Sequence, residues 1–150
     1  YRFSICWTRI FPTGMEEEPN EAGLKFYENI INLLNEYHME PLITICHDML
    51  PAYLADNYDG WASRVTIDAY LKLCKVLFER FKGKVKYWLT FNELNLCKGY
   101  AMIGIHNAEP QKISIFKYST KKPKTKTNIW LAQSSATIPL NGVQLILVGY

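Results

Sequence analysis

The sequence predicts an α/β fold built on parallel strands. Three short apolar segments with strand character alternate with two longer segments in which apolar residues recur every three or four positions. Strands that alternate with amphipathic helices imply parallel pairing through right-handed crossover connections. The connections after the first two strands are long and rich in turn residues, whereas those that return from helix to strand are short. The long loops therefore gather at the carboxyl ends of the strands.

The three strands are expected at Arg2 to Trp7, Leu42 to Cys46 and Val85 to Phe91. Pro41 stands at the entry of the second strand, where a missing backbone N–H is tolerated. The third strand is apolar almost throughout, which is typical of a parallel strand covered on both faces.

Two helices are expected between these strands. The first begins at Asn20 or Pro19 and carries a continuous apolar stripe, made of Leu24, Tyr27, Ile30, Ile31, Leu34 and Tyr37. The second runs from about Arg64 to Phe81, where Ser63 can cap its start and Gly83 can end it.

Charge divides the chain into two regions. Residues 1–110 hold eleven Lys or Arg and fourteen Asp or Glu, whereas residues 111–150 hold six Lys and no acidic residue, so the net charge of +3 comes from the tail. We expect residues 111–150 to be a divergent, poorly ordered basic tail, in which Leu145 to Val148 would form one short strand. The run from Lys121 to Lys126 could contact nucleic acid or anionic lipid, but a solvated segment explains it as well and is favoured.

Composition excludes several classes of protein. No apolar run reaches the roughly 18 residues of a membrane span, and no signal pattern opens the sequence, so a cytoplasmic protein without membrane or nucleic-acid partners is expected. The cysteines are widely separated and the histidines lack metal-ligand spacing, which favours packed thiols and no metal site. These residues are Cys6, Cys46, Cys74 and Cys97, with His38, His47 and His106.

The segment Thr90-Phe91-Asn92-Glu93 places an amide and a carboxylate side by side where the third strand ends. A carboxylate at the exit of a buried strand is held rigidly beside a loop, which suits catalysis. Taken alone, Asn-Glu after a strand is more often an ordinary turn, so a functional interpretation needs support from other segments.

Three further segments support a functional interpretation of Thr90 to Glu93. Tyr1 to Ile10 reads YRFSICWTRI, Glu40 to His47 reads EPLITICH, and Tyr58 to Trp61 reads YDGW. Together with the segment TFNE, in this order and spacing, they resemble glycoside hydrolase family one, the family of β-glucosidases and 6-phospho-β-glucosidases. The resemblance covers residues 1 to about 106.

The resemblance implies a (β/α)₈ barrel, whereas the pattern alone leaves a doubly wound sheet open, because three strands suit either. A complete barrel takes roughly 250 residues. Residues 1–110 are therefore expected to be a partial TIM barrel, roughly strands two to four with their helices, and the chain a fragment of the N-terminal half. The oligomeric state stays open.

The resemblance also implies retaining hydrolysis of a β-glycosidic bond by two carboxylates, without a cofactor. Glu93 matches the general acid/base, and Asn92 matches the residue that contacts the sugar 2-hydroxyl. His47 matches a hydroxyl-binding histidine, although a histidine satisfied at a strand end is the simpler alternative. Arg2 matches the arginine that holds the nucleophilic carboxylate, unless it only pairs with an acid of the barrel.

The departures from the family pattern keep alternatives open. Asp48 stands where many members have an aromatic residue, and the nucleophile motif is absent, with no Asp or Glu after Glu109. The segment Tyr53 to Trp61 looks most like the 6-phospho-β-glucosidase branch, with Trp61 expected in packing. The alternatives are an unphosphorylated β-glucosidase or β-galactosidase, and a non-catalytic remnant with at most weak sugar binding.

Overall fold

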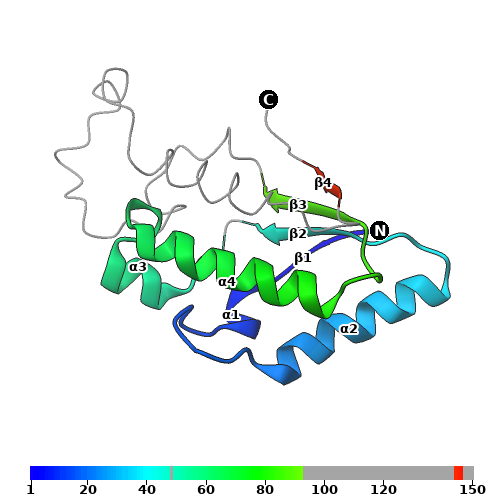
Figure 1. Cartoon of the computed structure of the whole chain (residues 1–150), viewed down its shortest axis with the longest axis horizontal. Helices are drawn as coiled ribbons and strands as arrows, with labels where there is room; N and C mark the ends of the chain where they lie inside the picture. Colours follow the sequence, from blue (N-terminus) through cyan, green and yellow to red (C-terminus); the bar gives the residue numbers. More distant parts are fainter. Residues whose placement is uncertain (48, 93–143, 147–150) are drawn as a thin grey trace, which may run out of the picture.

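The computed structural model describes residues 1–47, 49–92 and 144–146. Helices and strands alternate along most of this part of the chain (Figure 1). In chain order the elements are β1 (Arg2–Ser4), α1 (Trp7–Ile10), α2 (Glu21–Glu36), β2 (Leu42–Cys46), α3 (Ala52–Tyr58), the 3₁₀ helix η1 (Gly60–Ala62), α4 (Arg64–Arg80), β3 (Tyr87–Phe91) and β4 (Gln144–Ile146).

The strands form one parallel sheet in the order β1-β2-β3-β4, and α1, α2 and α4 lie on one side of it (Figure 1). Ser4 is paired with Thr44, and Cys46 with Phe91, so the strands end close together along one edge. The predicted α/β class and parallel pairing are therefore confirmed. In the tail, the strand predicted at Leu145 to Val148 is confirmed in part, because β4 covers Gln144–Ile146 beside β3, whereas residues 147 and 148 lie outside the described residues. The division of the chain at residue 110 stays a prediction.

The first strand is shorter than predicted, and Trp7 lies in a helix instead. The backbone N–H of Ile5 makes the last contact with the neighbouring strand, at Thr44 O. The next N–H, that of Cys6, donates to the Tyr27 hydroxyl of α2 at 2.7 Å, and Arg9 N then donates to Cys6 O. The chain therefore leaves the sheet after Ile5, because the next backbone N–H finds its acceptor in the Tyr27 hydroxyl of α2.

The predicted start of α2 is confirmed. The Asn20 side chain accepts hydrogen bonds from the backbone N–H groups of Ala22 at 3.1 Å and Gly23 at 3.4 Å. These groups have no partner within the helix, so the cap stabilises its first turn. The start of α4 follows the same rule, since Ser63 accepts from Val65 N at 3.2 Å.

The long connection after β2 contains two helical elements that were not predicted, α3 and η1. They meet at Asp59, which adopts a left-handed conformation with φ of 58°. The first turn of α4 holds the second element, because Thr66 donates from its buried hydroxyl to Gly60 O at 2.6 Å.

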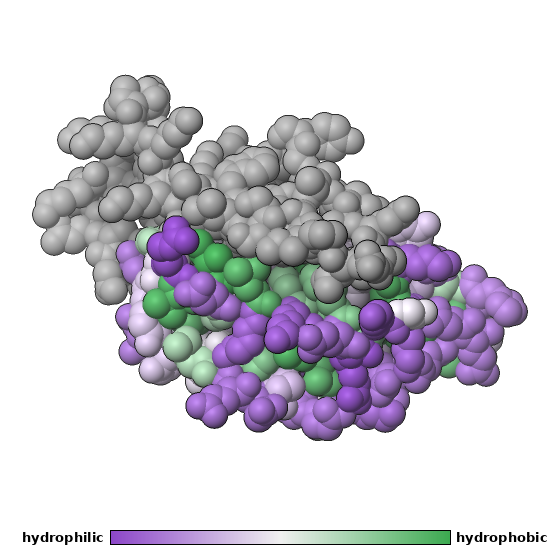
Figure 2. All heavy atoms as spheres, in the orientation of Figure 1, coloured by the Kyte–Doolittle hydropathy of each residue, from purple (hydrophilic) through white to green (hydrophobic). Residues whose placement is uncertain are grey.

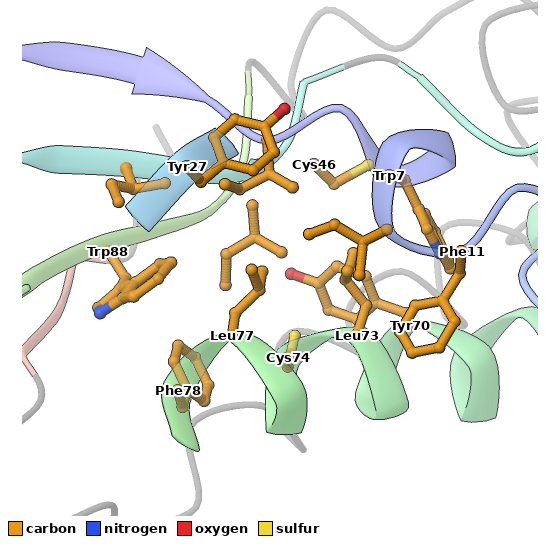
Figure 3. Packing of buried hydrophobic residues seen from close by; sticks show 14 of the residues in the cluster. Trp7, Phe11, Tyr27, Cys46, Tyr70, Leu73, Cys74, Leu77, Phe78 and Trp88 are labelled. Carbon is orange, nitrogen blue, oxygen red and sulfur yellow. The ribbon is translucent and has the colours of Figure 1, made fainter. Parts of the chain in front are cut away.

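The core lies between the sheet and the helices, and α4 supplies much of it (Figure 3). Tyr70 stacks on Phe91 with ring centroids 4.7 Å apart, and its hydroxyl donates to Thr90 O at 2.8 Å. Trp61 is buried against the same two rings, and Trp88 packs on Phe78. The packing role predicted for Trp61 is confirmed. The end of β3 is therefore held by large, rigid side chains.

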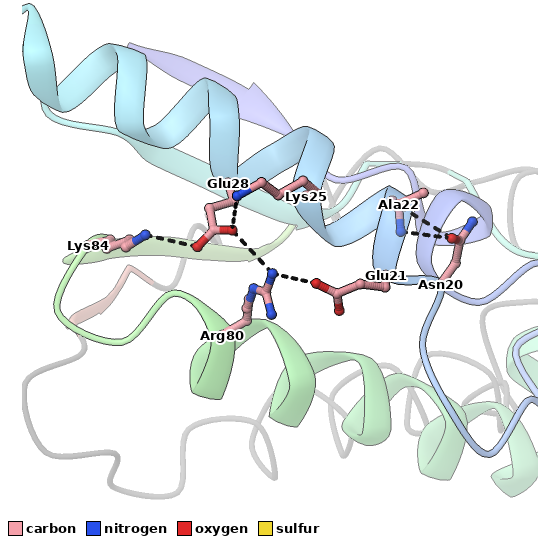
Figure 4. Close-up of polar contacts among 8 residues, drawn as sticks. Asn20, Glu21, Ala22, Lys25, Glu28, Arg80 and Lys84 are labelled. Atoms are coloured by element: carbon pink, nitrogen blue, oxygen red, sulfur yellow. Dashed lines mark hydrogen bonds and ion pairs between the residues drawn. The ribbon is translucent and has the colours of Figure 1, made fainter.

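A network of charged side chains ties α2 to α4 and to the loop that follows it (Figure 4). Glu28 accepts from Lys84 at 2.9 Å, from Lys25 at 3.1 Å and from Arg80 at 3.2 Å. Arg80 also contacts Glu21 at 2.6 Å. The hydrogen bonds from Lys84 and Lys25, with the charge of Arg80, lower the pKa of Glu28 from 4.5 to about 2.

This network predicts a loss of stability in acid. A carboxyl group whose pKa is depressed by folding stabilises the fold above its unfolded pKa and loses that contribution as the pH falls through the folded value. Glu28→Gln should therefore lower the denaturation midpoint at pH 7, and its difference from wild type should shrink as the pH falls from about 4.5 towards 2. Glu36→Gln, at an exposed position of α2 without an ion pair among the described residues, is the control. A pH-independent difference would contradict the prediction.

On the face seen in Figure 2, hydrophilic residues predominate over the helical side of the molecule, with apolar residues between them. None of the helices in the described ranges has the length and apolar character that a membrane span requires.

Candidate active site

Two of the predicted site residues follow neighbouring strands directly. Asn92 comes after β3 and His47 after β2. The backbone N–H of Asn92 donates to Cys46 O at 3.0 Å, so the pairing of the two strands continues to this point. Because the strands are parallel and in register, both side chains start from the same edge of the sheet.

The third predicted residue, Arg2, reaches this edge from the neighbouring strand β1. Its Nε donates to Thr44 Oγ1 at 3.2 Å, and its Nη2 donates to Asn92 Oδ1 at 2.8 Å. The guanidinium thereby connects residues of β1 and β2 with the residue that follows β3. Thr44 is fully buried and the exposed fraction of Asn92 is 9%, so these contacts are made at the border of the core.

The contact with Arg2 fixes the orientation of the Asn92 amide. A guanidinium only donates hydrogen bonds, so the amide atom that faces it has to be the carbonyl oxygen. The Nδ2–H groups of Asn92 are then left to donate elsewhere. Asn92 is thus presented as a hydrogen-bond donor at the carboxyl end of β3.

His47 is held by a residue that was not predicted. Its Nδ1 lies 3.0 Å from the hydroxyl of Ser4, the last residue of β1. Arg2 and Ser4 are two positions apart on this strand and so lie on the same face of the sheet. One strand therefore supplies the contacts that hold both Asn92 and His47.

The structure brings together Arg2 and Asn92 by direct contact, and it joins His47 to the same strand through Ser4. Glu93, the predicted acid/base, and Asp48 lie outside the described residues. The roles of Arg2, His47, Asn92 and Glu93 stay predictions at this point.

Thr44 and Ser4 are the residues that sequence reasoning missed. The available signal was their polarity within strands, since Thr44 stands between Ile43 and Ile45, and Ser4 follows Phe3. A polar residue that alternates with apolar ones faces away from the helices covering the other side of the sheet. The sequence alone did not say which side chain each hydroxyl would meet.

Within the described ranges, no group of three or more His, Cys, Asp or Glu side chains is placed to hold a metal ion. Among the described cysteines, burial raises the pKa of the Cys74 thiol to about 12. A thiol with this pKa is protonated at neutral pH and therefore a poor nucleophile. The described residues at the strand edge offer a guanidinium, an amide, an imidazole and hydroxyl groups, which can bind a ligand rich in hydroxyl groups.

Comparison with known proteins relates the chain to glycosidases. Residues 1–140 match the model of glycosyl hydrolase family 1. The chain is 51% identical over 96 residues to the aryl-phospho-β-D-glucosidase BglH of Bacillus subtilis, which is 64% of this chain and 20% of that protein. It is 48% identical over 95 residues to a 6-phospho-β-glucosidase of Dickeya chrysanthemi, covering 63% of the chain and 20% of that protein.

A third relative is the 6-phospho-β-glucosidase AscB of Escherichia coli, 42% identical over 96 residues, or 64% of the chain and 20% of that protein. The chain thus spans about one fifth of the length of these relatives. The family match, in contrast, extends over nearly all of its residues. On that evidence, the chain belongs to glycosyl hydrolase family 1.

Proposed function

We propose that this chain provides the acid/base half of a retaining glycosidase that hydrolyses 6-phospho-β-glucosides. The observation that carries the proposal is the hydrogen bond of 2.8 Å between Arg2 and Asn92, which fixes a donor amide immediately before Glu93 in the sequence. The corresponding fold proposal is that β1, β2 and β3 are strands two, three and four of a (β/α)₈ barrel. The cytoplasmic location stays a prediction.

In this proposal Glu93 protonates the leaving oxygen and later activates water. A second carboxylate attacks the anomeric carbon to form a covalent glycosyl-enzyme, at about 5 to 5.5 Å from the first. Residues 110–150 contain no Asp or Glu, so they do not supply this nucleophile. The chain alone is therefore expected to need an external nucleophile for turnover.

Asn92 and His47 would bind the sugar. The Nδ2–H groups of Asn92 would donate to the 2-hydroxyl, a contact that strengthens as positive charge develops on the adjacent carbon. His47 would bind another ring hydroxyl. Arg2 would keep the amide of Asn92 in its donor orientation. This role would come in addition to the predicted one, in which Arg2 holds the nucleophilic carboxylate.

The phosphorylated substrate is supported by the names of the relatives, which are phospho-β-glucosidases at 42 to 51% identity. An unphosphorylated β-glucoside or β-galactoside is the alternative within the same chemistry. The alternative from another class is a non-catalytic remnant with at most weak sugar binding.

Azide separates these possibilities. In a chain that binds the glycoside but lacks the nucleophile, azide attacks the anomeric carbon, the bond to the aryl oxygen breaks, and Glu93 gives its proton to that oxygen. Purified chain should therefore release nitrophenol from nitrophenyl β-glucoside 6-phosphate when azide is added, with α-glucosyl azide 6-phosphate as the other product. Faster reaction of the unphosphorylated glucoside would favour the alternative substrate. No reaction from a folded chain would favour the remnant.

The Arg2 contacts give a second prediction. Arg2→Lys keeps the charge, but an ammonium group does not reproduce the fork that reaches both Thr44 and Asn92. The azide-dependent kcat/KM should fall about tenfold, as expected for loss of one hydrogen bond to a charged group. Arg9→Lys is the matched control, because Arg9 lies over the Phe26 ring at 4.2 Å and away from the strand edge. Equal rates for the two variants would exclude this role of Arg2.

A further inference from the structure

We propose that Thr44 is a positioning residue, whose hydroxyl accepts from Nε of Arg2 and holds the guanidinium in the place from which it orients the Asn92 amide. The proposal deepens the function proposed above and rests on it. The observations behind it are two hydrogen bonds donated by Arg2, from Nε to Thr44 Oγ1 at 3.2 Å and from Nη2 to Asn92 Oδ1 at 2.8 Å.

The direction of both hydrogen bonds is fixed by the chemistry of the guanidinium. This group carries only N–H donors, so Thr44 Oγ1 and Asn92 Oδ1 are the acceptors. The guanidinium is also planar and rigid, so its Nε and Nη2 atoms move together. Two acceptors set both the place and the tilt of the plane, whereas Asn92 alone would leave it free to turn about a single contact.

Thr44 is the anchored member of the three residues. It is fully buried in β2, where it is paired with Ser4 of β1 and with Leu89 of β3. Its side chain is β-branched, which restricts rotation about χ1 and keeps the hydroxyl in one direction. Arg2, in contrast, is a long exposed side chain on a strand of three residues. The fixed hydroxyl therefore positions the guanidinium, and not the reverse.

The strand register places the hydroxyl on the path from Arg2 to Asn92. Arg2 is paired with Leu42, so its side chain runs towards the carboxyl ends of the strands to reach Thr44, two positions later. Asn92 lies further along, where its backbone N–H donates to Cys46 O. A hydroxyl at position 44 thus supports the guanidinium midway along its reach.

Two substitutions at Thr44 separate its hydroxyl from its packing. Thr44→Val replaces the hydroxyl by a methyl group of similar size, and water can take the place of the hydroxyl at the exposed Arg2, so the denaturation midpoint should stay close to that of wild type. Thr44→Ser keeps the hydroxyl but removes a methyl group from the core, which should lower the midpoint.

The azide-dependent release of nitrophenol from nitrophenyl β-glucoside 6-phosphate should follow the opposite order. Thr44→Val should lower kcat about threefold to tenfold with KM within about twofold, because the contact of Asn92 with the 2-hydroxyl strengthens in the transition state. Thr44→Ser should keep kcat within about twofold of wild type, since the hydroxyl remains. Wild-type kcat in Thr44→Val, or a loss in Thr44→Ser as large as in Thr44→Val, would overturn the proposal.

A double variant tests whether Thr44 acts through Arg2. Arg2→Met removes the donors, so adding Thr44→Val to it should change kcat by less than about twofold. Independent roles would instead multiply the losses of the two single variants, and that result would overturn the proposal.

Nitrogen-15 spectra of the Arg2 side chain test the proposal without any glycoside. The Nε–H group should exchange with water about tenfold faster in Thr44→Val than in wild type or Thr44→Ser, and the Nδ2–H signals of Asn92 should shift. Unchanged Arg2 and Asn92 signals in Thr44→Val would overturn the proposal. If wild type shows no azide-dependent reaction while these signals respond, the proposed function fails, whereas the positioning of Asn92 by Thr44 stands. The two failures are therefore distinguishable.

Discussion

Gly23→Ala is expected to destabilise the chain by about 3 kcal/mol, at the upper end of the usual cost of overpacking. A Cβ atom built on Gly23 would lie 2.1 Å from the carbonyl oxygen of Arg9 and 2.9 Å from its carbonyl carbon. Both are backbone atoms, so no side chain can rotate to make room. The first turn of α2 and the end of α1 would have to separate.

The separation would also affect the residues on either side of this contact. Asn20 donates from its backbone N–H to Ile10 O at 2.8 Å, and its side chain caps α2 through Ala22 and Gly23. A shift between α1 and α2 strains these hydrogen bonds as well. Denaturant titration of wild type and Gly23→Ala measures the difference in the free energy of unfolding.

Gly83→Ala is the matched control. Gly83 has φ of 76°, and a Cβ added there would meet no atom within 4 Å. The same substitution then costs only the strain of the left-handed conformation, about 1 kcal/mol. Equal losses at the two glycines would contradict the close contact between α1 and α2, because conformational strain alone would then explain both.

The fold was predictable in the helices that are long enough for their apolar pattern to repeat. α2 and α4 have 16 and 17 residues, so their apolar stripes recur over several turns, and polar caps mark where both begin. α1 has 4 residues and α3 has 7, too few for a helical period to stand out from chance. The turn at Cys6 depends on the Tyr27 hydroxyl, a contact across 21 positions that no local pattern contains.

The candidate site was predictable in its residue types but not in its contacts. Arg2, His47 and Asn92 were named because their segments resemble family motifs, whereas the pattern of strands and helices alone left the barrel open. The hydrogen bond between Arg2 and Asn92 joins residues 90 positions apart and depends on the register of the strands. Thr44 and Ser4 were missed for the same reason, since their partners become visible only once the strands are aligned.

Glu93→Gln should have the largest effect on the azide-dependent reaction if the proposed function holds. A general acid contributes about 10² to 10⁴ in rate, and an amide of the same shape has no proton to give. Loss of nitrophenol release by at least 10²-fold is therefore expected, while binding of the glycoside changes little. Glu18→Gln makes the same chemical change at an exposed position in the loop before α2 and should leave the rate unchanged.

A second leaving group tests whether the slower reaction of Glu93→Gln reflects the loss of proton transfer. Dinitrophenolate is a much weaker base than nitrophenolate and departs without a proton, so Glu93→Gln should react with dinitrophenyl β-glucoside 6-phosphate and azide at nearly the wild-type rate. A variant that had lost its fold or its sugar contacts would be slow with both substrates. Equal loss on both leaving groups would therefore remove Glu93 from the role of acid, whereas a selective loss would tie the carboxylate beside Asn92 to protonation of the departing oxygen.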